Sequence, residues 1–398
     1  MRPTAFEFEQ YRSFLSPARV RLGGKLTLLY GYNNAGKSAL LRGLVMMAAS
    51  CKPRAAKPNQ LLALDHPAVR GTDFLGLVTR GPHAPRIKLG LAWGDDRVSL
   101  ALLAIYSVEE RTGTPVVEVI KSDGFDLNAT WQPNEELEPI YEVPGANPIA
   151  IDFDGLLVGP PHQRLRAAMQ EFGQSMHWLP PTREPPRSRY TADGREYVPE
   201  DPIPFLQRLG PDNAVYVHVQ SALNRLAGVD LVTGRDSQGA YATVSPRGLP
   251  ARAVPLLSVG EGINQVLPVV ALAAMALEGR LGQSPLVAIE QPELHLHPAA
   301  ELALVDVLLE ACAGDARFIL ETHSETLLLG LQLAVAEGRL APDDVSVCWV
   351  ERDEGGLSTV RDVPLRKDGS REGWPPGVFS EHLAQSRKIL EARENARK

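Results

Sequence analysis

The sequence has few cysteines, and none of them belongs to a paired motif. The 398 residues include three cysteines, Cys51, Cys312 and Cys348, and no two of them have a C-x-x-C spacing. An odd number of scattered cysteines excludes a disulfide framework and a zinc ribbon. Because this usage is typical of a reducing compartment, we expect a cytoplasmic protein.

Long apolar runs are also missing. The most apolar stretch, residues 266–277, contains Pro268 and is too short to span a bilayer. Residues 1–14 lack the apolar core of a secretory signal. The sequence therefore predicts a protein that is neither exported nor inserted in a membrane, and it predicts a buried helix at residues 266–277.

An excess of positive charge is absent as well. Lys and Arg total 41 against 48 Asp and Glu, a net charge of −7. This balance excludes a general nucleic-acid binder, because attraction to phosphate depends on basic side chains. One segment is locally basic, and two interpretations of it stay open: a solvated, proline-stiffened loop, or a contact for phosphate or a partner. That segment contains Arg183, Arg187, Arg189 and Arg195.

A complete phosphate-loop motif is present near the N-terminus. Residues 31–38 read Gly-Tyr-Asn-Asn-Ala-Gly-Lys-Ser, between an apolar strand at 26–30 and a helical run at 38–49. Backbone N–H groups of such a loop, together with the following helix N-terminus, surround phosphate oxygens. Lys37 is predicted to reach the β- and γ-phosphates of ATP, and the Ser38 hydroxyl to bind Mg²⁺. The loop residues predicted to surround the nucleotide are Asn33, Asn34, Ala35 and Gly36.

A second apolar strand ends in a carboxylate. Residues 286–289 read Leu-Val-Ala-Ile and lead into Glu290, which we predict to hold the Mg²⁺ directly or through water. The segment that follows contains Glu293, His295 and His297. A metal site there is the weaker interpretation, because no third ligand is evident nearby.

Two further elements follow the same order along the chain. A Ser/Gly turn at residues 257–265 opens a long helix, an arrangement that presents N–H groups to an anion. A strand at residues 318–322 leads into His323, whose side chain can donate to a γ-phosphate oxygen.

In this order and spacing, the four elements resemble those of the SMC/RecF/OLD branch of ABC ATPases. The resemblance is strongest to stand-alone bacterial AAA-type proteins with a Glu-Gln-Pro-Glu-x-His-x-His-Pro segment, seen here at 290–298. It implies that 257–265 is a signature loop, which caps the γ-phosphate bound by a second copy of the chain. Either Ser258 and Gly260 or the end that begins at Gly262 would make that contact. The segment 291–298 would lie at the subunit interface.

The same resemblance assigns further positions. Arg12 and Ser13 match the contact to the adenine and ribose edge, and His323 matches the switch histidine. Residues 373–379, with Trp374, resemble the Trp-Pro tail of one subfamily.

Gln291 departs from most ABC ATPases, which have Glu at this position to activate the attacking water. An amide cannot accept that proton. The catalytic candidates are therefore Gln291, Glu293 and His323, and we predict an ATPase that hydrolyses slowly.

The expected fold is an α/β ABC-type ATPase head, a mixed sheet flanked by helices. Residues 1–85 and 256–350 would form its core, 86–150 an antiparallel β subdomain, 151–255 a helical and Pro/Arg-rich lobe, and 351–398 a tail. The chain between the phosphate loop and the signature loop shows no sustained heptads, so no long coiled coil is expected.

Two functional classes remain open. One is an ATP-gated homodimeric switch that controls a separate effector protein in a bacterial anti-phage module. The other is a RecF-like ATPase of DNA metabolism that clamps DNA. The acidic net charge and the missing coil favour the switch.

Overall fold

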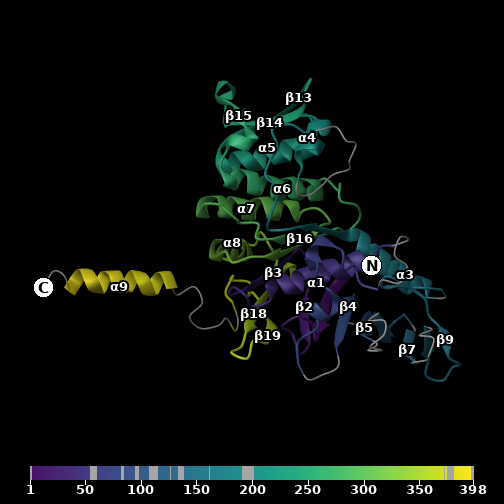
Figure 1. The fold of residues 1–398 in the computed structure, drawn as a ribbon. Coiled ribbons are helices and arrows are strands. Elements are labelled where there is room, and N and C mark those ends of the chain that lie inside the picture. Colours follow the sequence, from purple (N-terminus) through teal and green to yellow (C-terminus); the bar gives the residue numbers. More distant parts are fainter. Residues whose placement is uncertain are drawn as a thin grey trace.

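Two large sheets and a group of helices form the body of the molecule (Figure 1). The computed structural model describes residues 2–53, 61–81, 85–94, 98–106, 115–125, 127–132, 139–160, 162–190, 201–371, 373 and 381–395.

The central sheet has the order β12-β16-β17-β3-β18-β19. The bounds are β12 (Met176–Leu179), β16 (Leu286–Glu290), β17 (Arg317–Glu321), β3 (Leu26–Gly31), β18 (Val345–Arg352) and β19 (Ser358–Asp362). The first five strands are parallel, and β19 pairs antiparallel at the edge. The expected strands that lead to the phosphate loop, to Glu290 and to His323 are therefore confirmed. Because β3, β16 and β17 run in one direction, their carboxyl ends meet at one edge of the sheet.

The second sheet is antiparallel and has the order β2-β1-β4-β5-β6-β7-β8-β9. The bounds are β1 (Pro3–Glu9), β2 (Ala18–Arg21), β4 (Arg86–Trp93), β5 (Val98–Tyr106), β6 (Pro115–Asp123), β7 (Leu127–Trp131), β8 (Ile140–Glu142) and β9 (Ile149–Ala150). The antiparallel sheet expected after residue 86 is thus present, and the N-terminal hairpin β1–β2 extends it.

Helices cover both faces of the central sheet. The helices are α1 (Lys37–Ser50), α2 (Phe74–Leu77), α3 (Gln163–Ser175), α4 (Ile203–Leu209), α5 (Ala214–Ala227), α6 (Glu261–Leu277), α7 (Pro298–Ala311) and α8 (Glu325–Ala336). Leu29 packs with α1 and the second sheet in one core, whereas Leu28 packs with α5 to α8 in another. This alternation follows from the period of two along a strand, and it seats the phosphate-loop strand between two apolar layers.

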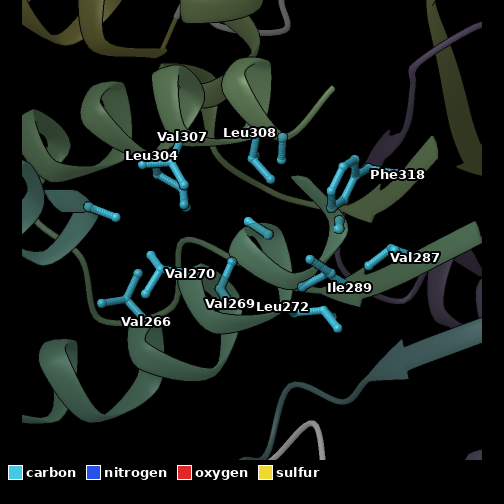
Figure 2. Close-up of a cluster of buried hydrophobic side chains, with 14 of the residues drawn as sticks. Val266, Val269, Val270, Leu272, Val287, Ile289, Leu304, Val307, Leu308 and Phe318 are labelled. Carbon is cyan, nitrogen blue, oxygen red and sulfur yellow. The ribbon is translucent and has the colours of Figure 1, made fainter. Parts of the chain in front are cut away.

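Helix α6 lies inside the second of these cores. Figure 2 shows Val266, Val269 and Leu272 of α6 facing residues of β16 and α7, such as Ile289 and Leu304. Residues 264–276 are all buried, so the helix expected at 266–277 is confirmed. No helix in the described part of the chain is long and apolar enough to cross a bilayer.

The stretch 151–255, expected to be a helical lobe, also contains strands. It supplies β12 to the central sheet and forms the pair β10 (Phe153–Asp154) and β11 (Leu157–Val158). A separate sheet follows, made of β13 (Val229–Asp236), β14 (Gly239–Pro246) and β15 (Val254–Pro255). The physical reason is the alternation of Ala240, Ala242 and Val244, which places a buried stripe on one face of β14.

The last described element is α9 (Glu381–Asn395), drawn away from the body in Figure 1. Residues 385–393 of this helix are exposed. Residues 374–379 of the expected Trp-Pro tail lie outside the described residues.

Candidate nucleotide-binding site

An open cavity of about 580 Å³ lies at the carboxyl ends of β3 and β17. It is lined by Tyr11, Arg12, Ser13, Asn33, Asn34, Ala35, Gly36, Lys37, Ser38, Ala39, Arg42, Ala68, Arg70, Thr72, Gln291, Glu321, His323 and Arg352. This volume is in the range of small-molecule sites. The structure therefore brings residues 33–38 of the predicted phosphate loop together with Arg12, Ser13, Gln291 and His323.

The phosphate loop turns from β3 into α1 at Gly36. Gly36 has φ 110° and is the N-cap of α1, where no side chain caps the helix. A Cβ at this position would lie 2.8 Å from Cζ of Phe14, so the turn requires glycine for both conformation and space. The N-terminus of α1, which no side chain caps, directs its first N–H groups and the positive end of the helix dipole toward the cavity.

Lys37 is buried beneath the loop. Its Nζ donates hydrogen bonds to the carbonyl oxygens of Gly31 at 2.9 Å and Tyr32 at 2.8 Å. Burial lowers the pKa of Lys37, and the charge of Glu321 opposes that effect. The phosphate loop thus holds the Lys37 ammonium at a position where its positive charge would attract an anion such as phosphate.

Glu321 is the functional residue that the sequence did not reveal. The Ser38 hydroxyl donates to its Oε1 at 2.5 Å, and its Oε2 is buried with no hydrogen-bond partner among the described residues. Burial and the charge of Glu290 raise the pKa of Glu321. The available signal was a carboxylate at the end of the strand before His323, but its meaning depends on β17 lying beside β3.

Glu290, predicted to hold Mg²⁺, lies one strand further away and is fully engaged. Arg42 donates from Nε to both of its oxygens, at 2.9 and 3.0 Å, and from Nη2 to Oε2. Trp178 adds a hydrogen bond from Nε1 to Oε1 at 2.9 Å. Glu290 is not among the residues that line the cavity.

Glu293 supports the turn that carries His323. Its Oε1 accepts from Thr322 Oγ1 at 2.8 Å and from the backbone N–H of His323 at 2.9 Å. Burial raises the pKa of Glu293, and Glu293 does not line the cavity. Burial and the charge of Lys37 lower the pKa of His323 to about 4, so its imidazole is neutral near pH 7.

Gln291 directly follows the carboxyl end of β16 and lines the cavity. Its φ is 47°, and its backbone N–H donates to the Glu321 carbonyl at 2.7 Å. The buried guanidinium of Arg183 donates to the carbonyl oxygens of Glu290 and Gln291, both at 3.1 Å, and to that of Gln265 at 2.6 Å.

Two other arginines of the basic segment are paired within the chain. Arg187 forms an ion pair with Glu184, and Arg189 forms one with Asp236, both at 2.8 Å. Arg195 lies outside the described residues. These pairs favour the interpretation of a loop fastened to the body over a free phosphate contact.

The predicted signature loop lies outside the cavity of its own chain. None of Ser258, Gly260 and Gly262 lines that cavity. Ser258 and Gly260 are exposed, and a Cβ at Gly260 would meet no atom within 4 Å in the described part of the chain. A Cβ at Gly262 would lie 2.8 Å from the His295 carbonyl oxygen. Of the two possible registers, the Ser258–Gly260 end is the accessible one.

The two histidines after Glu293 have separate surroundings. His297 caps α7, with its Nδ1 accepting from the Ala299 N–H at 3.3 Å. His295 has φ 63° and packs its carbonyl against Gly262. No group of three or more His, Cys, Asp or Glu side chains suited to a metal ion is present among the described residues.

Several segments besides the phosphate loop form the rim of the cavity. Arg12 donates from Nη1 to the Gly76 carbonyl at 3.0 Å and from Nη2 to Thr72 Oγ1 at 3.2 Å. Ser13 Oγ accepts from Ser358 Oγ at 2.7 Å. Arg70 and Arg352 also line the cavity. The loop-rich sequence before β4 carries no motif that would have singled out Arg70 or Thr72.

The residues present fit a nucleotide with Mg²⁺. The uncapped helix N-terminus and Lys37 suit phosphates. Ser38 and the unpartnered buried oxygen of Glu321 supply hard oxygen ligands, and Mg²⁺ in phosphate sites needs only one or two carboxylates.

Comparisons with known proteins agree with this geometry. Residues 229–330 match the family model described as "AAA domain, putative AbiEii toxin, Type IV TA system". No curated protein shows significant similarity to the sequence.

Solved structures of SMC heads share the fold. An SMC head bound to the C-terminal winged-helix domain of ScpA is 12% identical with a TM-score of 0.54, covering 92% of this chain and 99% of that chain. The Pyrococcus furiosus Smc head with an extended coiled coil, bound to the C-terminal domain of ScpA, is 11% identical with a TM-score of 0.51, covering 98% of this chain and 99% of that chain. The chain thus has the α/β fold of these SMC heads, and its residues 229–330 are similar to an AAA domain.

Proposed function

We propose that this protein binds ATP with Mg²⁺, hydrolyses it slowly, and acts as a nucleotide-gated homodimeric switch. The single observation that carries the proposal is the cavity in which residues 33–38 of the phosphate loop, Gln291, Glu321 and His323 converge. The SMC-head fold, in which this cavity lies at the carboxyl ends of the central strands, supports it.

For the nucleotide, the proposed roles follow from position and charge. The N–H groups of residues 33–36 and the Lys37 ammonium would contact the phosphates. Ser38 and a strand-end carboxylate would hold Mg²⁺, which neutralises phosphate charge when bound. Arg12 and Ser13 lie on the rim, where the base and ribose would extend.

For turnover, the arrangement around His323 supports a slow reaction. Gln291 lines the cavity and can orient a water molecule without accepting its proton. Glu293 does not line the cavity, and its carboxylate instead accepts hydrogen bonds from Thr322 and from the backbone N–H of His323. Neutral His323 would contribute one hydrogen bond to the phosphate end of the site.

For dimerisation, the support is the exposed signature loop. Ser258 and Gly260 are accessible and lie outside the chain's own cavity, so they are free to cap a phosphate held by a second copy. The neighbouring Leu257 is 52% exposed, an apolar side chain that an interface would cover. A two-fold dimer would then contain two identical composite sites.

For the biological role, we propose control of a separate effector in an anti-phage module. The description of the matched domain names a putative toxin of a type IV toxin–antitoxin system, and this two-component setting is the support for a separate protein partner. The net charge of −7 and the internal pairing of Arg187 and Arg189 favour a protein partner over the DNA clamp of the RecF-like alternative.

Light scattering tests the switch. With Mg²⁺ and ATP the wild-type mass should double relative to the ADP and nucleotide-free samples. Lys37→Ala, which should not retain ATP, is expected to stay at the nucleotide-free mass under all three conditions. The same wild-type mass with ATP, with ADP and without nucleotide would contradict a nucleotide-gated dimer.

A further inference from the structure

Two glutamates end neighbouring strands of the central sheet. Glu290 ends β16, Glu321 ends β17, and the two are register partners in the parallel pairing. Both are buried, at 1% and 3% exposed. Because β17 lies between β16 and β3, Glu321 is on the strand adjacent to the phosphate loop. Strand order therefore brings Glu321, and not Glu290, to Ser38.

Glu290 already has a full set of partners. Arg42, whose side chain is 11% exposed, binds both carboxylate oxygens, and Trp178 donates to Oε1. A bidentate guanidinium is among the strongest partners of a buried carboxylate. Bringing a divalent cation to Glu290 would require Arg42 to withdraw, because the two positive charges would repel at close range.

Glu321, in contrast to Glu290, has one carboxylate oxygen without a hydrogen-bond partner among the described residues. That oxygen, Oε2, is buried, and Oε1 accepts from Ser38 at 2.5 Å. An ionised carboxylate with an unpaired buried oxygen is costly. The charges of Lys37 and Arg42 act on Glu321. However, Lys37 Nζ donates to the carbonyl oxygens of Gly31 and Tyr32, and Arg42 binds Glu290. Among the described residues, neither cation donates a hydrogen bond to the unpartnered oxygen of Glu321.

We propose that Glu321, with Ser38, is the carboxylate that binds the nucleotide's Mg²⁺ in this protein, and that Glu290 is a positioning residue clamped by Arg42 and Trp178. This inference rests on the proposed nucleotide function. It reassigns the metal contact from the strand that precedes Gln291 to the strand that precedes His323. Mg²⁺ would then lie between Ser38, Glu321 and phosphate oxygens, in an all-oxygen environment.

Mn²⁺ binding, followed by electron paramagnetic resonance with a non-hydrolysable ATP analogue, tests the assignment. Glu321→Gln keeps an acceptor for Ser38 but loses the charge, so Mn²⁺ affinity should fall by about tenfold or more. Binding of the analogue in EDTA should be no weaker than in the wild type. The matched variant Glu290→Gln should change Mn²⁺ affinity by less than about threefold and should lower the unfolding temperature, because Arg42 loses its counter-charge.

Each outcome decides between the assignments. Loss of Mn²⁺ affinity in Glu290→Gln with no loss in Glu321→Gln would overturn the inference. If Glu290→Gln does not fold, Glu321→Asp replaces it, because Asp retains the charge and should recover part of the Mn²⁺ affinity lost in Glu321→Gln. Wild-type protein that binds no analogue, with or without Mn²⁺, would instead refute the proposed nucleotide function.

Discussion

The carboxylate of Glu293 accepts a hydrogen bond from the backbone N–H of His323, with 2.9 Å between Oε1 and N. The same oxygen accepts from Thr322 Oγ1, so one atom secures the turn that brings the imidazole to the cavity. Glu293 therefore acts on His323 through the backbone, and its position relative to the cavity leads to the first prediction.

We predict that Glu293→Gln retains most of the ATPase rate, whereas Glu293→Ala loses it. The Gln side chain keeps an oxygen that can accept from Thr322 and His323. The Ala side chain leaves both donors unpaired, which should cost about 2 kcal/mol of unfolding free energy. Phosphate release and denaturant unfolding measure the two effects. A Glu293→Gln protein that is folded, binds ATP and has no activity would identify Glu293 as the general base.

We predict that Gln291→Glu raises the hydrolysis rate by about tenfold or more, because a carboxylate can take the proton that an amide cannot. Gln291→Asn is the matched control, since Asn tolerates the left-handed backbone at this position but also lacks a base. Single-turnover phosphate release measures both. Wild-type hydrolysis within the range of about 1–100 s⁻¹, unaltered by either change, would contradict the proposed role of Gln291.

We predict that Lys37→Ala weakens ATP binding at least tenfold, about 1.4 kcal/mol, because it removes the buried cation at the phosphate loop. Titration with a fluorescent ATP analogue gives the affinity. Lys88→Ala, on the second sheet, removes a lysine of the same charge away from the cavity and should bind as the wild type does. Equal affinity in wild type and a folded Lys37→Ala would leave the phosphate loop without its assigned role.

We predict that Gly260→Leu blocks the ATP-dependent dimer but not ATP binding by the monomer. The space around Gly260 is open, so the cost in stability should stay below about 1 kcal/mol, while the side chain would obstruct a partner's phosphate. Ala253→Leu places the same side chain at another exposed position and should dimerise normally. ATP-dependent doubling of mass in Gly260→Leu would exclude the Ser258–Gly260 end as the capping element.

Gly262 should respond differently from Gly260. In Gly262→Ala the new methyl group would meet the His295 carbonyl at 2.8 Å, and we expect a loss of about 1–2 kcal/mol in unfolding free energy. Thermal unfolding measures it. An unchanged unfolding temperature would show that the 291–297 turn moves aside easily.

The local elements of the site could be predicted from the sequence because each consists of consecutive residues. The phosphate loop, its strand and its helix occupy 26–50, and the strands that lead to Glu290 and His323 are short apolar runs. Backbone and burial requirements decide such segments, and these requirements are visible in a window of ten to twenty residues.

The partners of the carboxylates could not be predicted, because they depend on strand order and on residues far apart in the chain. Glu290 contacts Arg42 and Trp178, which are 248 and 112 residues away. Ser38 and Glu321 are 283 residues apart. Nothing in the runs around Glu290 and Glu321 distinguishes a carboxylate that is clamped by arginine from one that has a free oxygen.

The hydrogen bonds of Arg183 connect helix α6 to the carboxyl end of β16. The Arg183 guanidinium is buried and donates to carbonyl oxygens in two separate elements, Gln265 in α6 and Glu290 and Gln291 at the end of β16. In a dimer of the proposed kind, the start of α6 would meet the nucleotide of one subunit, and the end of β16 would meet that of the other. One guanidinium would then link the two nucleotide sites, so that loss of the phosphate at the first site would act on Gln291 beside the second.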